Sequence, residues 1–553
     1  MKTRLTIFLC VLLATGGRLA AAAENPRVAP PLYEGLGTHS RKISGATPDA
    51  QRYFDQGVAF AHGFNYDEGL RSMQQAASLA PECAMAWWGV ALACGPHINA
   101  TGVSAERAKL AVEALAKAGE FSAGCTTAER ALIGAQQPRF TSPPPKDGRA
   151  ALDRAHADAM REVYRAHPGD ADIAAWFAAA LLQLRPWDLW TREGQPHPGT
   201  EEAIAALEAA MRIESHHPLA LHLTIHAWEM SATPARADVA ADRLRDLQPL
   251  LGHMTHMPSH TDVRCGRWEA AILANTKAIA ADRRYCELSG KAPAAYLSYM
   301  AHDYHMLTYG AMMSGQGALA LRTMRSLLAD MPPEWREKNT AQADGYIAMI
   351  YEVQMRFGSW DDILAEPEPE AKFTLARAWR HAARAVAHAA KGEPALARAD
   401  QAKFVTARAV VPPKMQFRKN DAGVILGVTE KLLEGEILLR EGQAEPGLEA
   451  LGEAVRREDA LRYAEPPAWI QPVRHALGAS LMARGRFTEA EQVYRADLVH
   501  QPDNGWSLFG LARSLRLQKK NAGEATTLEA RFKKIWAKAD LELNTSCLCQ
   551  PGV

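Results

Sequence analysis

The sequence predicts an all-α protein, built as a solenoid of stacked helix pairs. Its composition is rich in Ala, Leu, Arg and Glu and has few β-branched runs, which favours helices. Its 553 residues are too many for one ordinary core, and suggest two or three domains or a solenoid that grows without a central core. Its sequence patterns also repeat at about 34 residues, the length of one helix pair.

The N-terminus has the pattern of an export signal. Lys2 and Arg4 precede the apolar stretch Leu5–Leu13, and Ala21–Ala23 offers a small-residue cleavage site. The apolar stretch is too short to span a bilayer, and no later segment is long enough. We therefore expect residues 1–23 to be a signal peptide. The mature protein should be periplasmic or secreted and have no integral membrane segment.

Charge and cysteine content limit the possible partners. Lys plus Arg equal Asp plus Glu at 63 each, so no long-range field draws the chain to nucleic acid, and we expect no such partner. Removal of the signal leaves an odd number of cysteines, so they cannot all pair within one chain. Cys547 and Cys549 form a CxC pair that could bind a soft metal, form a disulfide, or belong to a frayed tail.

Repeat units can be placed along most of the chain. The first begins at Ala50, and the pattern weakens between Cys94 and Gly199, where two proline-rich stretches indicate loops. Later units are expected from the following positions: Pro218, Gly252, Ala301, Asp344, Ala378, Gln471 and Gly505. We expect an insertion over 286–300, a connector over 366–370, and a division near residue 335 into solenoids of 24–335 and 336–553.

The unit that begins at Gln471 is the clearest. Small, aromatic and proline residues stand at its positions 7, 8, 15, 17, 20, 24 and 32, namely Leu477, Gly478, Gly485, Phe487, Ala490, Tyr494 and Pro502. This pattern resembles that of the tetratricopeptide (TPR) repeat family. The resemblance implies a right-handed TPR helix-pair superhelix of about ten pairs, several of them degenerate. It also implies that one stripe of each first helix lines a concave, ligand-binding groove.

Histidines gather in the middle units. Nine of the 19 histidines lie between His216 and His305, and His222 and His226 return 34 residues later as His256 and His260. Spacings of three and four residues place these imidazoles on one helix face. In the TPR frame the stripe contains seven imidazoles, one carboxylate and one phenol: His222, His226, His253, His256, His260, His302, His305, Glu229 and Tyr309.

Such a cluster is costly unless something uses the nitrogen lone pairs, and a transition metal does so. Seven imidazoles exceed one tetrahedral site, so two metals, or one metal with surrounding histidines, are both open. Imidazole-rich ligation suits copper, iron or zinc rather than calcium or magnesium. Copper is slightly preferred. Groove polarity or an acid–base cluster is the alternative to metal.

Pro258 interrupts one of the histidine-bearing units. It either kinks a helix or begins one, and in the second case His253 and His256 lie on the entering loop. The segment His253–Arg264 resembles an HMPSH-type signature of exported bacterial TPR proteins whose role is not established. The resemblance supports the register and implies no reaction.

The leading functional prediction is an exported metalloprotein that performs redox chemistry on an unidentified small substrate. Tyr309 would donate a proton or act as a redox partner, and Glu229 would be a ligand or a general base. The alternatives are a TPR adaptor that binds a peptide or an envelope protein, and a periplasmic metal store or chaperone. His62 and His475 are isolated in the sequence and receive no function, and His97 is a weak candidate at the groove mouth. Phosphate-loop, serine-hydrolase and covalent-haem motifs are missing.

Overall fold

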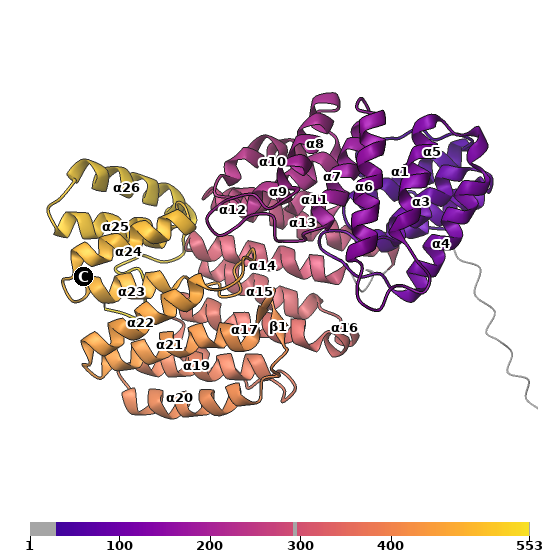
Figure 1. Cartoon of the computed structure of the whole chain (residues 1–553). Coiled ribbons are helices and arrows are strands. Elements are labelled where there is room, and N and C mark those ends of the chain that lie inside the picture. Colours follow the sequence, from indigo (N-terminus) through magenta and orange to yellow (C-terminus); the bar gives the residue numbers. More distant parts are fainter. Residues whose placement is uncertain (1–28, 291–295, 552–553) are drawn as a thin grey trace, which may run out of the picture.

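The structure is a computed structural model that describes residues 29–290 and 296–551. The expected signal peptide and part of the expected insertion lie outside these residues. Almost every element is a helix, and most helices pack against the next one along the chain, as the sequence predicted. The chain forms a TPR-type superhelix that curves from the indigo N-terminal helices to the yellow C-terminal ones (Figure 1).

The N-terminal helices include the stretch in which the repeat pattern is weak. Their bounds are α1 (Pro48–His62), α2 (Tyr66–Leu79), α3 (Ala84–Cys94), α4 (Ala105–Glu120), η1 (Ser122–Gly124), α5 (Thr127–Gln136), η2 (Gln137–Arg139), α6 (Ala150–Ala166), α7 (Ala171–Gln183) and α8 (Thr200–Ile213). Polar caps set several of the helix starts. Thr126 and Glu129, for example, form a reciprocal capping box at α5.

The middle of the chain carries the histidine-rich units. Its helices are α9 (Pro218–Glu229), η3 (Pro234–Ala237), α10 (Asp238–Leu244), α11 (Gly252–His256), α12 (Pro258–Arg264), α13 (Trp268–Ser289), α14 (Leu297–Met313) and α15 (Gly317–Asp330). Helix α12 begins at Pro258, as in the second alternative, but His253 and His256 lie on the short helix α11 rather than on a loop. Met257 between the two helices keeps helical angles (φ −49°, ψ −40°), so the histidines on both sides remain on one continuous path.

The remaining elements form the C-terminal half. They are α16 (Pro333–Lys338), α17 (Thr340–Arg356), α18 (Trp360–Ala365), α19 (Thr374–Ala390), α20 (Pro394–Ala409), β1 (Gln416–Phe417), β2 (Asn420–Asp421), α21 (Ala422–Arg440), α22 (Ala444–Asp459), α23 (Val473–Met482), α24 (Phe487–His500), α25 (Gly505–Leu517), α26 (Ala522–Ile535) and η4 (Trp536–Lys538). The repeat pattern predicts no unit over α21 and α22. Their close crossing depends on small residues, since a Cβ on Gly435 would meet the Gly447 carbonyl oxygen at 3.0 Å.

The last helices pack against helices from the middle of the chain. The indole of Trp506 on α25 donates to the Met312 carbonyl at 2.8 Å, and that of Trp268 on α13 donates to the Pro502 carbonyl at 3.1 Å. Buried apolar residues form two clusters, one from Ile43 to Tyr296 and the other from Val263 to Cys549. The division expected near residue 335 stays a prediction.

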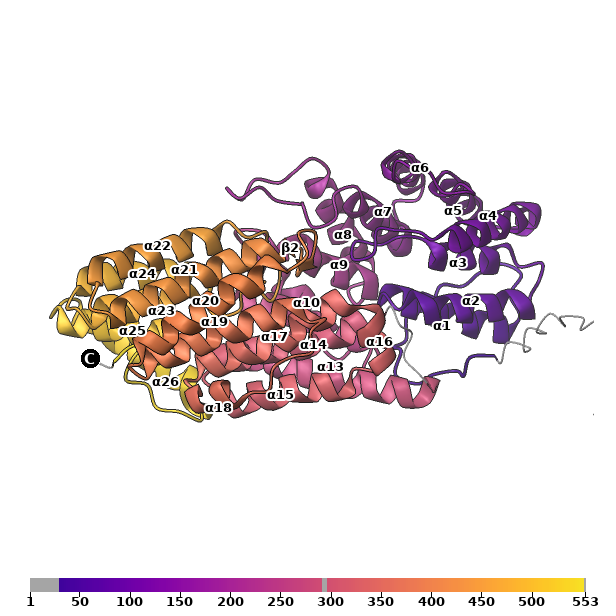
Figure 2. The same ribbon diagram turned by 90° about the horizontal axis from the view of Figure 1, so that it is seen from below.

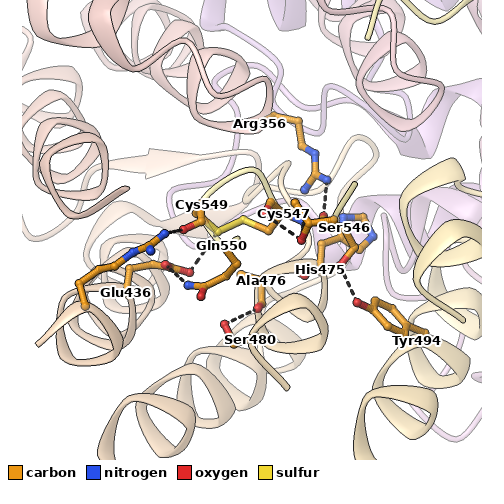
Figure 3. Close-up of a disulfide and its surroundings, with 12 residues drawn as sticks. Arg356, Glu436, His475, Ala476, Ser480, Tyr494, Ser546, Cys547, Cys549 and Gln550 are labelled. Atoms are coloured by element: carbon orange, nitrogen blue, oxygen red, sulfur yellow. Dashed lines mark hydrogen bonds between the residues drawn. A yellow bond between two sulfur atoms is a disulfide. The ribbon is translucent and has the colours of Figure 1, made fainter. Parts of the chain in front are cut away.

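The C-terminal tail crosses the interior of the second half. Cys547 and Cys549 form a disulfide, and both are buried (Figure 3). Arg356 donates to the Ser546 carbonyl at 2.8 Å, and the Tyr494 hydroxyl lies 2.6 Å from that of Ser546. Of the three alternatives for the CxC pair, the structure therefore shows the disulfide, in an anchored tail.

Candidate metal centre

The predicted histidines come from four helices in the middle of the chain. Proline begins both α9 and α12, where its missing N–H removes no helix hydrogen bond. The donors are His222 and His226 on α9, His253 and His256 on α11, His260 on α12, and His302 and His305 on α14. All except His302 are at most 2 % exposed, so these rings lie in the interior rather than along an open groove.

His222, His226 and His253 form a first triad. One ring nitrogen from each lies within 4.8 Å of the others. Nδ1 of His222 lies 2.8 Å from the His62 carbonyl oxygen, and Nδ1 of His226 lies 2.7 Å from Oε1 of Glu229. Both Nδ1 atoms therefore donate, which leaves each Nε2 with a lone pair. Within residues 29–290 and 296–551, neither Nε2 has a hydrogen-bond partner, and neither nitrogen of His253 has one.

His256, His260 and His302 form a second triad, again with ring nitrogens within 4.8 Å. Nδ1 of His256 donates to the Asn275 side-chain oxygen at 2.6 Å, so its Nε2 carries a lone pair. This Nε2 lies 2.9 Å from Nε2 of His260. Two nitrogen lone pairs cannot approach this closely unless a cation lies between them, and either a proton or a metal ion meets that need.

Glu229 links the two triads. Its Oε1 accepts from Nδ1 of His226, and its Oε2 lies 2.6 Å from Nδ1 of His260. Burial alone would raise the pKa of Glu229, but His260 and His226 lower it well below its usual range. One carboxylate thereby fixes a histidine of each triad. This is the arrangement in which a carboxylate orients an imidazole that binds metal through its other nitrogen.

Burial sets the protonation of most of these rings. It lowers the pKa of His222, and the neighbouring imidazoles lower it further. The pKa values of His253, His256 and His302 are lowered in the same way. His260 differs. Burial opposes its protonation, but the Glu229 carboxylate outweighs burial and raises the pKa of His260 to about 9. In the metal-free protein His260 therefore holds the proton that it shares with His256.

Two residues of the predicted set lie outside the triads. The ring of His305 packs near Tyr346 and Phe417, with centroid distances of 6.0 and 6.2 Å. The hydroxyl of Tyr309 donates to the Gln501 side chain, and its ring packs edge-on against Trp268. Neither residue lines the cavity that borders the triads.

That cavity has a volume of about 760 Å³. Four triad histidines line it, namely His226, His253, His260 and His302. Its other walls come from α2, the loop after α3, Trp187, the β1–β2 hairpin and Glu465. The hairpin lies where the orange C-terminal helices meet the magenta region around α9 (Figure 2). A segment almost 200 residues beyond His226 thus helps to enclose the site.

Several contributors could not be identified from the sequence. Asn275 and Glu465 are isolated polar residues there, and only the fold brings Oε2 of Glu465 to 3.6 Å from Nδ1 of His260. His62 supplies a backbone carbonyl to His222, a role that leaves no mark in the sequence. His97 does line the cavity, in agreement with its weak signal as a helix-terminating loop residue.

A second histidine cluster lies near α7, and its partners are carboxylates. His39 lies 3.1 Å from both Asp172 and Glu214, and Nε2 of His217 lies 3.1 Å from Asp172. Nδ1 of His217 accepts the Ala220 N–H as the cap of α9. Every nitrogen of these two rings has a partner, so the cluster is explained as a buried ion-pair network.

Known proteins resemble this chain only weakly. No family model and no curated protein matches the chain. The TPR domain of P58(IPK) is 13% identical over 85% of this chain and 98% of that one, with a TM-score of 0.23. Human IFIT1, solved as a dimer with m7Gppp-AAAA, is 12% identical over 89% and 90%, with a TM-score of 0.30. Yeast Tom70 is 9% identical over 87% and 92%, with a TM-score of 0.28.

Among residues 29–290 and 296–551, no helix combines the length and apolarity needed to cross a membrane.

Proposed function

We propose that the protein binds a transition-metal ion at each histidine triad and uses the metals on a small molecule in the adjoining cavity. The observation that carries this proposal is the anchoring of Nδ1. His222, His226, His256 and His260 each have Nδ1 against an acceptor. Their Nε2 atoms consequently face the other members of their triads. Metal-binding histidines show this arrangement, since the anchored N–H fixes both tautomer and ring orientation.

The cost of an unused site supports the metal over a purely structural role. Nε2 of His222, Nε2 of His226 and both nitrogens of His253 are buried without a hydrogen bond to any residue in the described part of the chain. Each unsatisfied buried polar atom costs about 1–3 kcal/mol. A packed core would avoid these costs with apolar side chains of similar size. A ligand that uses several lone pairs at once accounts for their gathering.

The donor set favours copper, with zinc and iron next. Both triads consist of imidazole alone, which suits all three metals, and copper(II) binds nitrogen sites most tightly in the divalent series.

The reaction class that we propose is redox chemistry. Three protein ligands leave coordination positions free for a substrate, and the cavity gives access to them. Glu229 is occupied by two histidines, so we propose it as the group that positions them rather than as a ligand or general base. Glu465 is the carboxyl that faces the cavity beside His260, and burial raises its pKa. We propose no catalytic role for Tyr309, because its hydroxyl is hydrogen-bonded to Gln501.

Metal analysis of protein purified without a histidine tag tests the proposal. We expect about two metal ions per chain by elemental analysis, and an optical or EPR spectrum that identifies nitrogen ligation. The expected export can be checked on the same material, through the N-terminus of the mature chain. His305→Ala is the matched control, because it removes a buried imidazole that belongs to neither triad.

The alternatives give different results. Protein without near-stoichiometric metal, and with unchanged peptide binding after His256→Ala plus His260→Ala, would be an adaptor. Metal that is retained but exchanges no ligand when azide is added would indicate a store or chaperone. Either result contradicts the enzymatic proposal.

A further inference from the structure

The tip of the β1–β2 hairpin carries two cations into the cavity. Phe417 pairs with Asn420, which leaves Arg418 and Lys419 as a two-residue turn. Both residues have positive φ angles, 47° and 63°. This is the type I′ turn, for which Asn-Gly is the favoured sequence. The chain instead keeps two long cationic side chains there, at a cost in backbone strain.

Strained residues gather at this cavity. Seven non-glycine residues within the described part of the chain have positive φ, and four of them line the cavity: Phe64, Trp187, Arg418 and Lys419. Each such conformation costs of order 1 kcal/mol or more and persists only where the surroundings enforce it. Their concentration at one site indicates that the fold maintains these side-chain positions for a purpose other than stability.

Hydrogen bonds to the segment that contains Arg462 and Glu465 fix the position of the hairpin. The Asn420 amide donates to the Arg418 and Arg462 carbonyls at 3.0 and 3.1 Å, and its oxygen accepts the Arg462 N–H at 2.8 Å. Nη2 of Arg418 donates to the Glu465 carbonyl. The tip is therefore fixed in place over the histidines.

Two polar atoms of the tip have no hydrogen-bond partner among the residues that the structure describes. Nζ of Lys419 is sheltered from solvent and lies 2.9 Å from the centroid of the Trp187 ring. Nε of Arg418 is sheltered and unpaired as well. A buried ammonium without an anionic partner is costly. Burial, with Arg418 beside it, lowers the pKa of Lys419 to about 6.

The charges around the tip leave Lys419 without an anionic partner. Among the residues that line the cavity, Arg107 is paired with Asp67, and Glu465 accepts the Tyr463 hydroxyl at 2.6 Å. The carboxylate of Glu465 balances the charge of Arg418, so an anion bound beside Lys419 would favour the charged form of that lysine. The positive charge of Arg418 also contributes to the lowered pKa of His302, and that of Lys419 to the lowered pKa of His226. The two cations thus lie close enough to act on both triads.

We infer that Arg418 and Lys419 bind the anionic group of a small organic molecule, a carboxylate attached to an aromatic or apolar body, in the cavity beside the triads. The anion would accept from Nζ of Lys419 and Nε of Arg418, the two polar atoms that have no hydrogen-bond partner among the described residues. Seven phenylalanine, tyrosine and tryptophan rings would surround the body: Phe64, Tyr66, Trp187, Tyr296, Tyr299, Tyr346 and Phe417. The inference names a substrate class for the proposed function and rests on it for the reaction, but the anion site can be tested without metal.

Benzoate and benzamide are a suitable pair of probes, because they differ in charge but scarcely in shape. Isothermal titration calorimetry would measure both with the full-length protein, metal-loaded and chelator-treated. We expect benzoate to bind at least tenfold more tightly than benzamide. We also expect at least a tenfold loss of benzoate affinity in Lys419→Gln and in Arg418→Gln.

Arg462→Gln is the matched control. Arg462 is exposed and close enough to influence the charge of Lys419, but it does not line the cavity. Its removal should change benzoate affinity less than twofold. Circular dichroism and melting temperature would show that each variant is folded. A Lys419→Arg variant, which retains the charge, should recover most of the affinity if Lys419→Gln disturbs the fold.

Several results would overturn the inference. These are equal binding of benzoate and benzamide, no binding of either below 10 mM, or the same loss in Arg462→Gln as in Lys419→Gln. If inorganic phosphate binds as tightly as benzoate, the site does not recognise an aromatic or apolar body, and that part of the inference is wrong. Benzoate binding through Lys419 in a protein that holds no metal would refute the proposed function and leave the anion site standing. Metal retention without benzoate binding would refute the anion site and leave the proposed metal binding standing.

Discussion

Oε2 of Glu229 lies 2.6 Å from Nδ1 of His260, while its other oxygen accepts from His226. A single buried carboxylate thus connects two triads, each of which takes its histidines from two successive repeats. We expect Glu229→Gln to weaken metal binding at both triads by about 10–100-fold, the usual effect of losing a group that orients a ligand. Chelator competition would measure it. Glu208→Gln, an exposed position on α8, serves as the control. Weakening at one triad alone would contradict the bridging role.

The two triads should lose metal independently. His222→Ala removes a donor from the first triad and His302→Ala one from the second, so each variant should retain about one of two metal ions. The double variant should retain none. Elemental analysis after gel filtration gives the stoichiometry. Complete loss in either single variant would instead indicate one shared metal site.

His39 should make the stability of the fold depend on pH. Burial opposes its protonation, but Asp172 and then Glu214 outweigh burial and raise the pKa of His39 to about 9 in the folded protein. Because this is above the value of about 6.5 in the unfolded chain, the stabilisation is fully present below pH ~6.5 and is lost as the pH rises through about 9. The groups that face His39 are Asp172, Glu214, His62 and His217.

The size of this effect is about 3 kcal/mol at most, since one pKa unit corresponds to ~1.4 kcal/mol. Denaturant unfolding of the native chain and of His39→Gln at pH 6 and pH 10 would measure it. The variant should be less stable by about 2–3 kcal/mol at pH 6 and nearly equal at pH 10. A difference that does not change with pH would show that His39 acts by packing alone.

Replacing the two residues of the hairpin tip should make the protein more stable and abolish benzoate binding. Arg418→Asn with Lys419→Gly places the favoured type I′ sequence on an unchanged backbone, so we expect stabilisation of about 1–2 kcal/mol. The same variant should lose benzoate binding. Equilibrium unfolding and calorimetry on one preparation test both. A less stable variant would mean that the contact of Lys419 with Trp187 contributes more than the strain costs.

The disulfide should contribute only modestly to stability. Cys547 and Cys549 are two residues apart, and so small a closed loop gives about 1–2 kcal/mol. Ser546→Ala should have a comparable effect, because it removes hydrogen bonds to Tyr494 and to the His475 carbonyl. Urea unfolding of the two variants gives the comparison. A much larger loss in Cys547→Ser plus Cys549→Ser would show that Cys549 also matters through Glu436, 3.2 Å from its sulfur.

The sequence alone determined the all-α solenoid and most of its repeat units, because each helix pair is a local structure whose small, aromatic and proline positions recur along the chain. It also determined which histidines share a helix face, since spacings of three and four residues depend only on helix geometry. It did not indicate α21 and α22, whose crossing depends on Gly435 and Gly447 rather than on the usual aromatic positions.

Tertiary structure decided which of those histidines meet. His305 follows His302 by three residues, yet its ring packs with Tyr346 and Phe417, because α14 turns that position toward the C-terminal half. The placement of Lys419 beside Trp187 likewise depends on how distant parts of the superhelix pack. Contacts between residues more than 200 positions apart are set by the summed rotation of every intervening repeat, and no local pattern encodes that sum.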